Sequence, residues 1–187
     1  MTENAYYMAC LDLTGRAVLV VGGGRVALEK VDGLLRCGAR VTVVAPEIVP
    51  ELGELPVELV HRRYRPADLD GRFLVVAATS TRSVNETVFR DAEARSLLCN
   101  VVDVPELCSF ILPAVHREGP IAVAVSTGGA SPALAQRLRD EVARVVRPEH
   151  AALARRLRAL RPWAKRELPT YEARREYFAE LVRQELG

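Results

Sequence analysis

The sequence lacks any hydrophobic run approaching the ~20 residues that a helix needs to span a bilayer. Its first residues, MTENAYYMACLDL, have neither the basic start nor the apolar stretch of a secretory signal peptide. It also contains no internal repeat and no low-complexity segment. Because 49% of the 187 residues are hydrophobic and 27% are charged, the composition is that of a globular protein. We expect a cytoplasmic protein that has no membrane partner.

Motifs for metal binding, disulfide bonds and covalent nucleophiles are missing as well. The four cysteines include no CxxC pair, and the three histidines show no mutual spacing of metal ligands. No serine–histidine–aspartate or cysteine–histidine set can be nominated. We therefore expect no resident metal, and cysteines that act as small buried hydrophobic residues.

Neither sign of charge dominates the sequence, but the charges are unevenly spread. Residues 1–136 carry 13 Lys and Arg against 16 Asp and Glu, and residues 137–187 carry 13 against 8. These balances of −3 and +5 give the net charge of +2. The basic segment could meet an anionic molecule, or it could be a solvated helical face. Because aromatic residues do not alternate with the basic ones, we expect no nucleic-acid partner.

The stretch from Val18 to Lys30, VLVVGGGRVALEK, reads as a buried strand, a glycine turn and the start of a helix. The spacing Gly-x-Gly-x-x-Ala is typical of dinucleotide-binding turns. The first glycine permits the turn, the second lets a pyrophosphate approach, and the small third residue lets helix and strand pack closely. Amides at the helix start favour phosphate. The cofactor-binding residues expected here are Gly22, Gly23, Gly24, Arg25, Val26 and Ala27.

Strand and helix patterns alternate up to residue 103, which predicts an α/β fold with an open, Rossmann-type parallel sheet. Ligands bind beyond the carboxyl ends of such strands, so Pro46, Glu47, Thr79 and Asn100 are further candidate cofactor contacts. Apolar runs predict strands over 17–21, 40–45, 57–61, 73–78 and 97–102, and helical spacing predicts helices over 25–37 and 84–95.

The tip of the second predicted strand bears on the choice of cofactor. An acidic residue usually binds the adenosine ribose there, but this sequence has Ala45 and Pro46. Glu47 follows and could serve, or backbone atoms could do so. No arginine stands at this tip to receive a 2′-phosphate, so the sequence favours NAD over NADP.

The second part of the sequence is organised differently. Residues 121–125 predict one more strand, and 133–146 predict an amphipathic helix with its apolar residues on one side. Two further helical patterns, over 149–160 and 171–186, are broken by prolines. We predict three domains: a Rossmann domain over 1–112, a small α+β domain over 113–147 and a C-terminal helical domain over 148–187.

Asp103 directly follows the strand-like segment LLCNVV. Its carboxylate is expected at the sheet edge, beside the position of a nicotinamide. There it could act as a general base or orient a substrate nitrogen. The alternative is a turn or helix-capping aspartate, since Val104 and Pro105 follow.

A second glycine-rich loop, STGGASP, precedes the amphipathic helix. Its hydroxyls and amides would suit a carboxylate or a phosphate. It could also be a helix cap, with Ser131 at the N-cap and Pro132 at the first helical position. The two interpretations are compatible. The candidate substrate-binding residues are Ser126, Thr127, Gly128, Gly129 and Ser131.

Five segments of the sequence are LDLTGRAVLVVGGGRVALEKV, GARVTVVAPE, FLVVAATS, NVVDVPELCSFILPA and VAVSTGGASPALA. Together, and in this order, they resemble the siroheme synthase N-terminal family, the precorrin-2 dehydrogenase/sirohydrochlorin ferrochelatase group. One position departs from the family pattern: many members have an acidic residue directly after Ala-Ala-Thr, where this sequence has Ser80. The tail after Pro148 resembles the family only in general character.

The resemblance implies a homodimer of Rossmann, dimerisation and helical domains, with the active site in the cleft between them. It implies oxidation of precorrin-2 to sirohydrochlorin with NAD as cofactor, and in some members insertion of Fe²⁺ to give siroheme. The family's essential aspartate matches Asp103. The implied substrate is an anionic tetrapyrrole, which would give the basic segment over residues 137–187 a purpose. By charge alone, the candidate arginines are Arg137, Arg139, Arg155, Arg156 and Arg158.

Two other functions are also compatible with the sequence. One is a non-catalytic regulatory module that senses NAD without turning it over. The other is a chelatase that acts on sirohydrochlorin and retains NAD only as a vestige. The STGGASP loop and the basic tail favour the dehydrogenase over the sensor, because a sensor would need neither.

Overall fold

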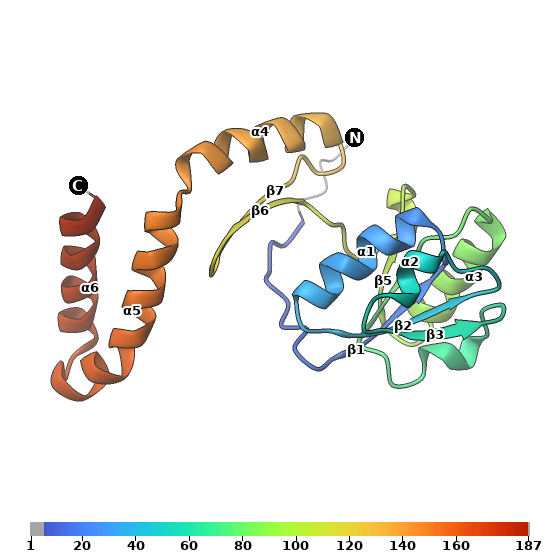
Figure 1. Ribbon diagram of the computed structural model, residues 1–187, viewed down its shortest axis with the longest axis horizontal. Coiled ribbons are helices and arrows are strands. Elements are labelled where there is room, and N and C mark those ends of the chain that lie inside the picture. The colour runs from blue at the N-terminus through green and yellow to red at the C-terminus, as the bar shows by residue number, and fades with distance from the viewer. Residues whose placement is uncertain (1–5, 187) are drawn as a thin grey trace. The chain divides into compact units, whose positions relative to one another are not determined.

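The computed structural model describes residues 6–186, which fall into two compact units (Figure 1). One unit is Tyr7–Ile111, and the other comprises residues 112–186 together with Tyr6. None of the helices within 6–186 is long and apolar enough to cross a membrane. The division into three domains stays a prediction, since the second unit forms one group of contacts.

The first unit is built on a five-stranded sheet in the order β3-β2-β1-β4-β5, with every pair parallel. The predicted Rossmann-type sheet is therefore confirmed. The strands are β1 (Ala17–Val21), β2 (Arg40–Ala45), β3 (Glu58–His61), β4 (Leu74–Ala77) and β5 (Leu98–Val101). The connecting helices are α1 (Arg25–Arg36), α2 (Pro50–Gly53) and α3 (Arg82–Glu93), with two 3₁₀ turns, η1 (Pro66–Leu69) and η2 (Pro105–Leu107).

The direction of strand addition reverses between β1 and β4. The chain adds β2 and β3 on one side of β1, then returns to add β4 and β5 on the other. Val21, the last residue of β1, pairs with Ala77, the last of β4. Both strands therefore end side by side, at the kind of switch point where ligands bind in such sheets.

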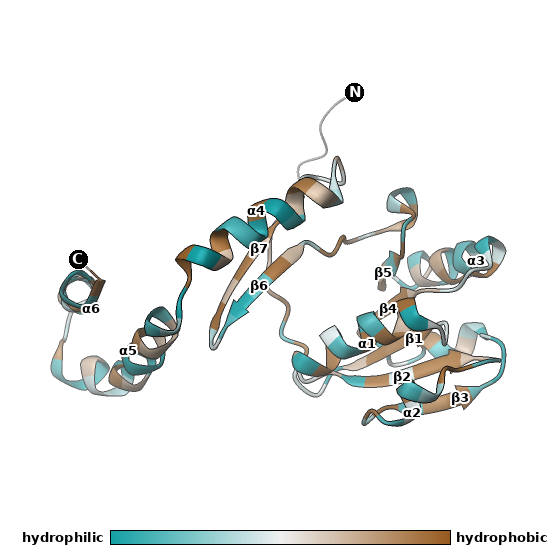
Figure 2. Cartoon of the chain, turned by 45° about the horizontal axis from the view of Figure 1, so that its top comes forward, coloured by the Kyte–Doolittle hydropathy of each residue, from teal (hydrophilic) through white to brown (hydrophobic). Residues whose placement is uncertain are grey.

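Helices cover both faces of this sheet, and β1 shows why. Val18 and Val20 belong to the core that contains α1 and α2, whereas Leu19 and Val21 belong to the core that contains α3 and η1. All four are buried. Residues that alternate between two buried faces must all be apolar, which produces the near-continuous hydrophobic strands seen in Figure 2.

The second unit begins with a hairpin of β6 (Ala114–Glu118) and β7 (Ile121–Val125), which pair antiparallel. Three helices follow: α4 (Pro132–Val145), α5 (Pro148–Glu167) and α6 (Tyr171–Leu186). Helix α4 packs against both strands of the hairpin, and α5 packs against α6.

Three elements differ from the sequence prediction. Strand β6 was not predicted, because AVHRE carries two charged residues and lacks a clear apolar alternation. Helix α2 has only four residues, too few for a periodic pattern. The break expected at Pro162 was wrong, since α5 continues to Glu167. A proline removes only one helical hydrogen bond, and packing of Trp163 on Tyr177 of α6, with ring centroids 5.3 Å apart, holds the helix beyond it.

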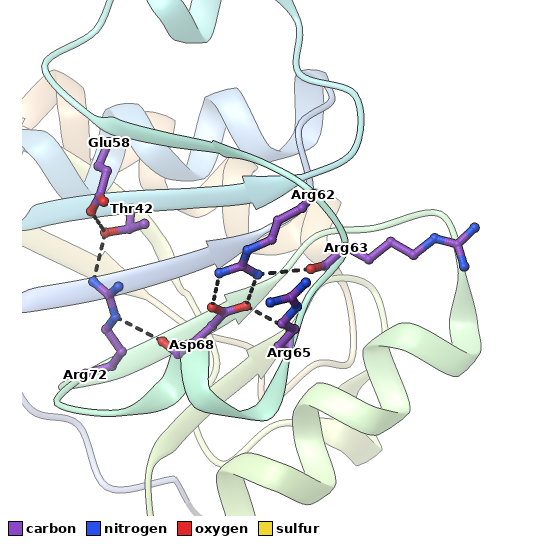
Figure 3. A network of polar contacts seen from close by, with 7 residues as sticks. All are labelled: Thr42, Glu58, Arg62, Arg63, Arg65, Asp68 and Arg72. Atoms are coloured by element: carbon purple, nitrogen blue, oxygen red, sulfur yellow. Dashed lines mark hydrogen bonds and ion pairs between the residues drawn. The ribbon is translucent and has the colours of Figure 1, made fainter.

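A polar network fixes the connection between β3 and β4 (Figure 3). Arg62 donates two hydrogen bonds to the carboxylate of Asp68, at 2.9 and 2.6 Å. Arg72 donates to the Asp68 carbonyl at 3.0 Å and to the Thr42 hydroxyl at 2.8 Å. That hydroxyl donates to Glu58 at 2.9 Å. The η1 turn is thereby attached to β2 and β3.

We expect Asp68 to make stability depend on pH. Its hydrogen bonds from Arg62 hold the pKa of this carboxyl below its ordinary value. The stabilisation is therefore complete above the ordinary aspartate pKa and is lost as the pH falls through the lowered one.

Asp68→Asn should lower the free energy of unfolding at neutral pH by about 1–3 kcal/mol. It should also flatten the acid dependence, measured by urea unfolding at several pH values. Asp70→Asn, at an exposed aspartate nearby, is the control and should change little. An unchanged acid dependence in Asp68→Asn would contradict the assignment.

Candidate dinucleotide-binding site

A cleft of about 990 Å³ lies at the carboxyl edge of the sheet, within the first unit. Its walls come from the segments that follow all five strands. Most of the predicted cofactor residues line it, and so does the predicted catalytic aspartate. These residues are Gly22, Gly23, Gly24, Arg25, Val26, Pro46, Glu47, Thr79 and Asp103.

The three glycines of the turn have three different reasons to be glycine. Gly22 has φ +126°, and a Cβ there would lie 2.4 Å from the carbonyl oxygen of Ala78. A Cβ on Gly23 would lie 2.2 Å from the carbonyl oxygen of Glu47. A Cβ on Gly24 would meet no described atom within 4 Å. The first two glycines are thus required by the protein itself, whereas Gly24 leaves open space for a ligand.

Helix α1 starts at this open space. Gly24 is its N-cap, and no side chain caps the first turn. The amides of Arg25 and Val26 therefore stand at a helix start whose dipole favours an anion. Ala27 is fully buried and lies outside the cleft, so its smallness serves helix–strand packing as predicted. The cradle fits the pyrophosphate of a dinucleotide.

The segment after β2 is attached to the glycine turn by backbone hydrogen bonds. Val49 donates to the carbonyl of Gly23 at 2.8 Å, and Gly22 donates to the carbonyl of Val44 at 3.0 Å. These bonds place Pro46 and Glu47 on the cleft wall. The carboxylate of Glu47 is exposed and has no hydrogen-bond partner within residues 6–186. It is available to accept from ribose hydroxyls.

The loop after β4 is held by a residue that the sequence did not single out. Asn85 is buried, and its amide donates to the Thr79 carbonyl at 3.0 Å. Its Oδ1 accepts from the Thr79 hydroxyl at 2.7 Å. These bonds fix Thr79, which lines the cleft together with Ser80 and Thr81. Asn85 lies on α3, six residues after Thr79, where no motif marks its role.

Asp103 lies on a tight turn at the end of β5. Val104 donates to the carbonyl of Val101 at 3.2 Å, and Asp103 has φ +61°. Asp and Asn adopt this left-handed conformation more readily than most residues. Asp103 does not cap η2, whose N-cap is Val104. Its carboxylate is exposed on the cleft and has no hydrogen-bond partner in the described part of the chain, so it is free to contact a ligand.

Asn100 does not line the cleft, contrary to the expectation for a cofactor contact. It is buried in β5, and its amide donates to the Phe110 carbonyl at 3.0 Å and to Cys108 Sγ at 3.5 Å. Asn100 instead attaches the segment after η2 to the sheet.

Arg63 is a cleft residue that the sequence reasoning missed. Ala45 of β2 pairs with His61 of β3, so Glu47 and Arg63 each lie two residues beyond a register pair. In the sequence, a cofactor-selecting arginine is expected at the tip of β2, whereas Arg63 follows β3. The basic run after a strand-like segment, HRRYR, was the available signal.

The STGGASP loop forms the N-cap that was predicted. The hydroxyl of Ser131 accepts from the amide of Leu134 at 3.2 Å, and Pro132 is the first residue of α4. Thr127 shapes the loop, since its hydroxyl accepts from the Ser131 amide at 3.1 Å. Gly128 and Gly129 face open space. The binding role of the loop stays a prediction.

The candidate arginines of the second unit fall into two groups. Arg137, Arg139 and Arg156 form ion pairs with acidic neighbours. Arg155 and Arg158 form no ion pair with a residue in 6–186. No acidic side chain in this range therefore offsets the positive charges of their guanidinium groups. No three His, Cys, Asp or Glu side chains within the same range are grouped as metal ligands.

Fold and cleft together define a Rossmann-type dinucleotide-binding protein. Comparison with known families agrees: residues 9–114 match the NAD(P)-binding family NAD_binding_7, and residues 118–144 match the family described as sirohaem biosynthesis protein central. The chain belongs to the NAD(P)-binding family NAD_binding_7. The second match lies in a sirohaem-biosynthesis family, and the two matches together confirm the resemblance seen in the sequence.

Individual proteins that resemble the chain are siroheme synthases and a precorrin-2 dehydrogenase. The siroheme synthase of Thioalkalivibrio sulfidiphilus is 41% identical over 181 residues, which cover 95% of this chain and 37% of the relative. Siroheme synthase 2 of Aeromonas hydrophila is 42% identical over 168 residues, covering 89% and 36%. The chain thus spans well under half the length of these relatives. A solved structure named SirC, precorrin-2 dehydrogenase, is 29% identical with a TM-score of 0.80, and the match covers 95% of this chain and 89% of that one.

Proposed function

We propose that this chain is an NAD-dependent dehydrogenase that oxidises precorrin-2 to sirohydrochlorin in siroheme biosynthesis. The observation that carries the proposal is the shared cleft: the open cradle at Gly24 and the free carboxylate of Asp103 line one cavity. The match to a solved precorrin-2 dehydrogenase over nearly the whole chain supports the choice of substrate.

The reaction removes one hydride and one proton from the macrocycle. When bound, NAD⁺ supplies the hydride acceptor and becomes NADH. The amides at the start of α1 hold its pyrophosphate, and Glu47 accepts from a ribose hydroxyl. Asp103 accepts the proton that leaves the macrocycle, as a general base. Its position at the end of β5 places it on the side of the cleft opposite Glu47, which follows β2.

Groups in the second unit suit the carboxylates of the substrate. The open backbone at Gly128 and Gly129 and the start of α4 offer amides to an anion. Ser126, Thr127 and Ser131 add hydroxyl groups to the same loop. Arg155 and Arg158 offer cationic groups that no acidic residue in the described range neutralises. We assign these residues to substrate binding.

The decisive experiment incubates the full chain with precorrin-2 and NAD⁺, with and without Fe²⁺, and follows the absorption spectrum. NADH and sirohydrochlorin should form without iron. Binding of NAD⁺ without any oxidation would favour the sensing module. Iron insertion into added sirohydrochlorin, with no oxidation of precorrin-2, would favour the chelatase. Conversion to siroheme only when Fe²⁺ is present would extend the activity to metal insertion.

Asp103→Asn tests the assigned base. Asparagine tolerates the left-handed backbone at this position, so the fold should be unaffected. Loss of a general base should lower the rate of NADH formation by about 100-fold or more, with NAD⁺ affinity unchanged. Glu106→Gln, which removes an exposed carboxylate three residues later on η2, is the control and should keep the wild-type rate. Full turnover by Asp103→Asn would remove this residue from its role.

We further propose that two copies of the chain associate through α4, within the α+β segment predicted as the dimerisation domain. Leu134, Leu138 and Val145 share one face of this helix and are 49%, 39% and 68% exposed. Ala135, on another face, is buried. The hairpin beneath α4 has only two strands, and such a pair is marginal by itself. A second copy would cover the apolar face.

We also propose a cytoplasmic location. Cys10 is exposed rather than buried as expected from the sequence, and a reducing compartment suits such an exposed thiol.

Leu138→Glu should therefore yield a monomer, because it places a charge within the apolar face. Gln136→Glu adds the same charge on the other side of α4 and should leave the dimer intact. Mass measured by light scattering during gel filtration distinguishes the two states. A monomeric wild-type chain, or a dimeric Leu138→Glu variant, would contradict the proposed interface.

A further inference from the structure

A second cavity, of about 600 Å³, adjoins the cofactor cleft on the side of α3. Its lining is mainly apolar, with Val21, Val44 and Val84 among the walls and the Tyr64 ring beside them. The two cavities share residues from the ends of β2, β3 and β4, among them Pro46, Arg63 and Thr79. A dinucleotide whose pyrophosphate lies at Gly24 can therefore extend past the tip of β2 and place its adenine in the second cavity.

The position of Arg63 marks the junction between the two cavities. Since Arg63 lines both cavities, it lies where a ligand would pass from one to the other. In the dinucleotide orientation just described, that point corresponds to the adenosine ribose, which joins the pyrophosphate to the adenine.

Arg63 is also held in place while its charge stays available. Its neighbour Arg62 is engaged with Asp68, and the same Arg62 donates to the carbonyl of Arg63 at 3.1 Å. The network thus fixes the Arg63 backbone. Figure 3 shows the Arg63 side chain extending away from the network. Its guanidinium forms no ion pair with any residue between 6 and 186.

Glu47 supplies the opposite charge on the same cleft. In dinucleotide-binding sheets, a carboxylate at this edge accepts from the ribose 2′-hydroxyl of NAD, and an arginine accommodates the 2′-phosphate of NADP. A strictly NAD-selective site would have the carboxylate and no arginine. This site has both groups, because Glu47 follows β2 and Arg63 follows β3.

We infer that the cleft binds NADP⁺ as well as NAD⁺, with Arg63 as the residue that contacts the 2′-phosphate. The inference rests on the proposed dinucleotide site and adds a specificity-determining residue to it. The NAD preference expected from the tip of β2 is thereby reduced to a modest one. A guanidinium suits this role because it can donate two parallel hydrogen bonds to one phosphate.

The test measures binding by calorimetry and needs no tetrapyrrole. NAD⁺ and NADP⁺ are titrated separately into the full chain, into Arg63→Gln and into Arg65→Gln. Arg65 is the matched control, since it is an exposed arginine two residues later that does not line the cleft. The wild-type chain should bind both nucleotides, with dissociation constants within about tenfold of each other. Arg63→Gln should weaken NADP⁺ binding about tenfold or more and NAD⁺ binding less than about threefold.

The other outcomes separate the inference from the proposed function. NAD⁺ binding without NADP⁺ binding would overturn the role of Arg63 and leave the dehydrogenase intact. Equal weakening of both nucleotides in Arg63→Gln would also overturn it, because the residue would then contact a part that the two share. An equal effect of Arg65→Gln on NADP⁺ would reduce the result to general charge attraction. Binding of neither nucleotide to the wild-type chain would contradict the cofactor site itself.

Discussion

The close approach of the glycine turn to two neighbouring carbonyl groups is the constraint on which the site depends. Backbone of Gly22 meets the carbonyl of Ala78, and backbone of Gly23 meets that of Glu47, at distances that exclude a Cβ atom. The segments after β1, β2 and β4 can therefore meet at one edge of the sheet. Their contact leaves Gly24 and the start of α1 as an open cradle, and it places Glu47 and Thr79 on its walls.

The cleft is polar at its edges and rests on an apolar sheet. The central strands are buried on both faces, so they hold the loops at their ends in fixed positions. Side-chain hydrogen bonds then set individual loops: Asn85 fixes Thr79, and Asp68 fixes the segment that carries Arg63. Asp103 and Glu47 remain exposed, and neither carboxylate has a hydrogen-bond partner among the described residues. Both are therefore available to a ligand.

Much of this site could be predicted from the sequence, because local patterns determine it. The apolar runs mark the strands, and the rule that ligands bind at strand ends selected the glycine turn, Glu47, Thr79 and Asp103. The features that the sequence did not predict correctly depend on tertiary packing. Arg63 reaches the cleft through the pairing of β3 with β2, which no local pattern reveals. Asn100 faces the Phe110 carbonyl rather than the ligand edge, and Pro162 is carried within a helix that α6 supports.

The central claim is that Gly24, unlike its neighbour, is kept open for a dinucleotide. It is tested most directly by comparing Gly24→Ala with Gly23→Ala in thermal unfolding and in NAD⁺ binding. Gly24→Ala should keep the wild-type melting temperature and lose NAD⁺ affinity about tenfold or more, because its Cβ occupies the path of the pyrophosphate. Gly23→Ala should unfold at a clearly lower temperature, since its Cβ collides with the Glu47 carbonyl. Wild-type NAD⁺ affinity in a stable Gly24→Ala variant would contradict the account.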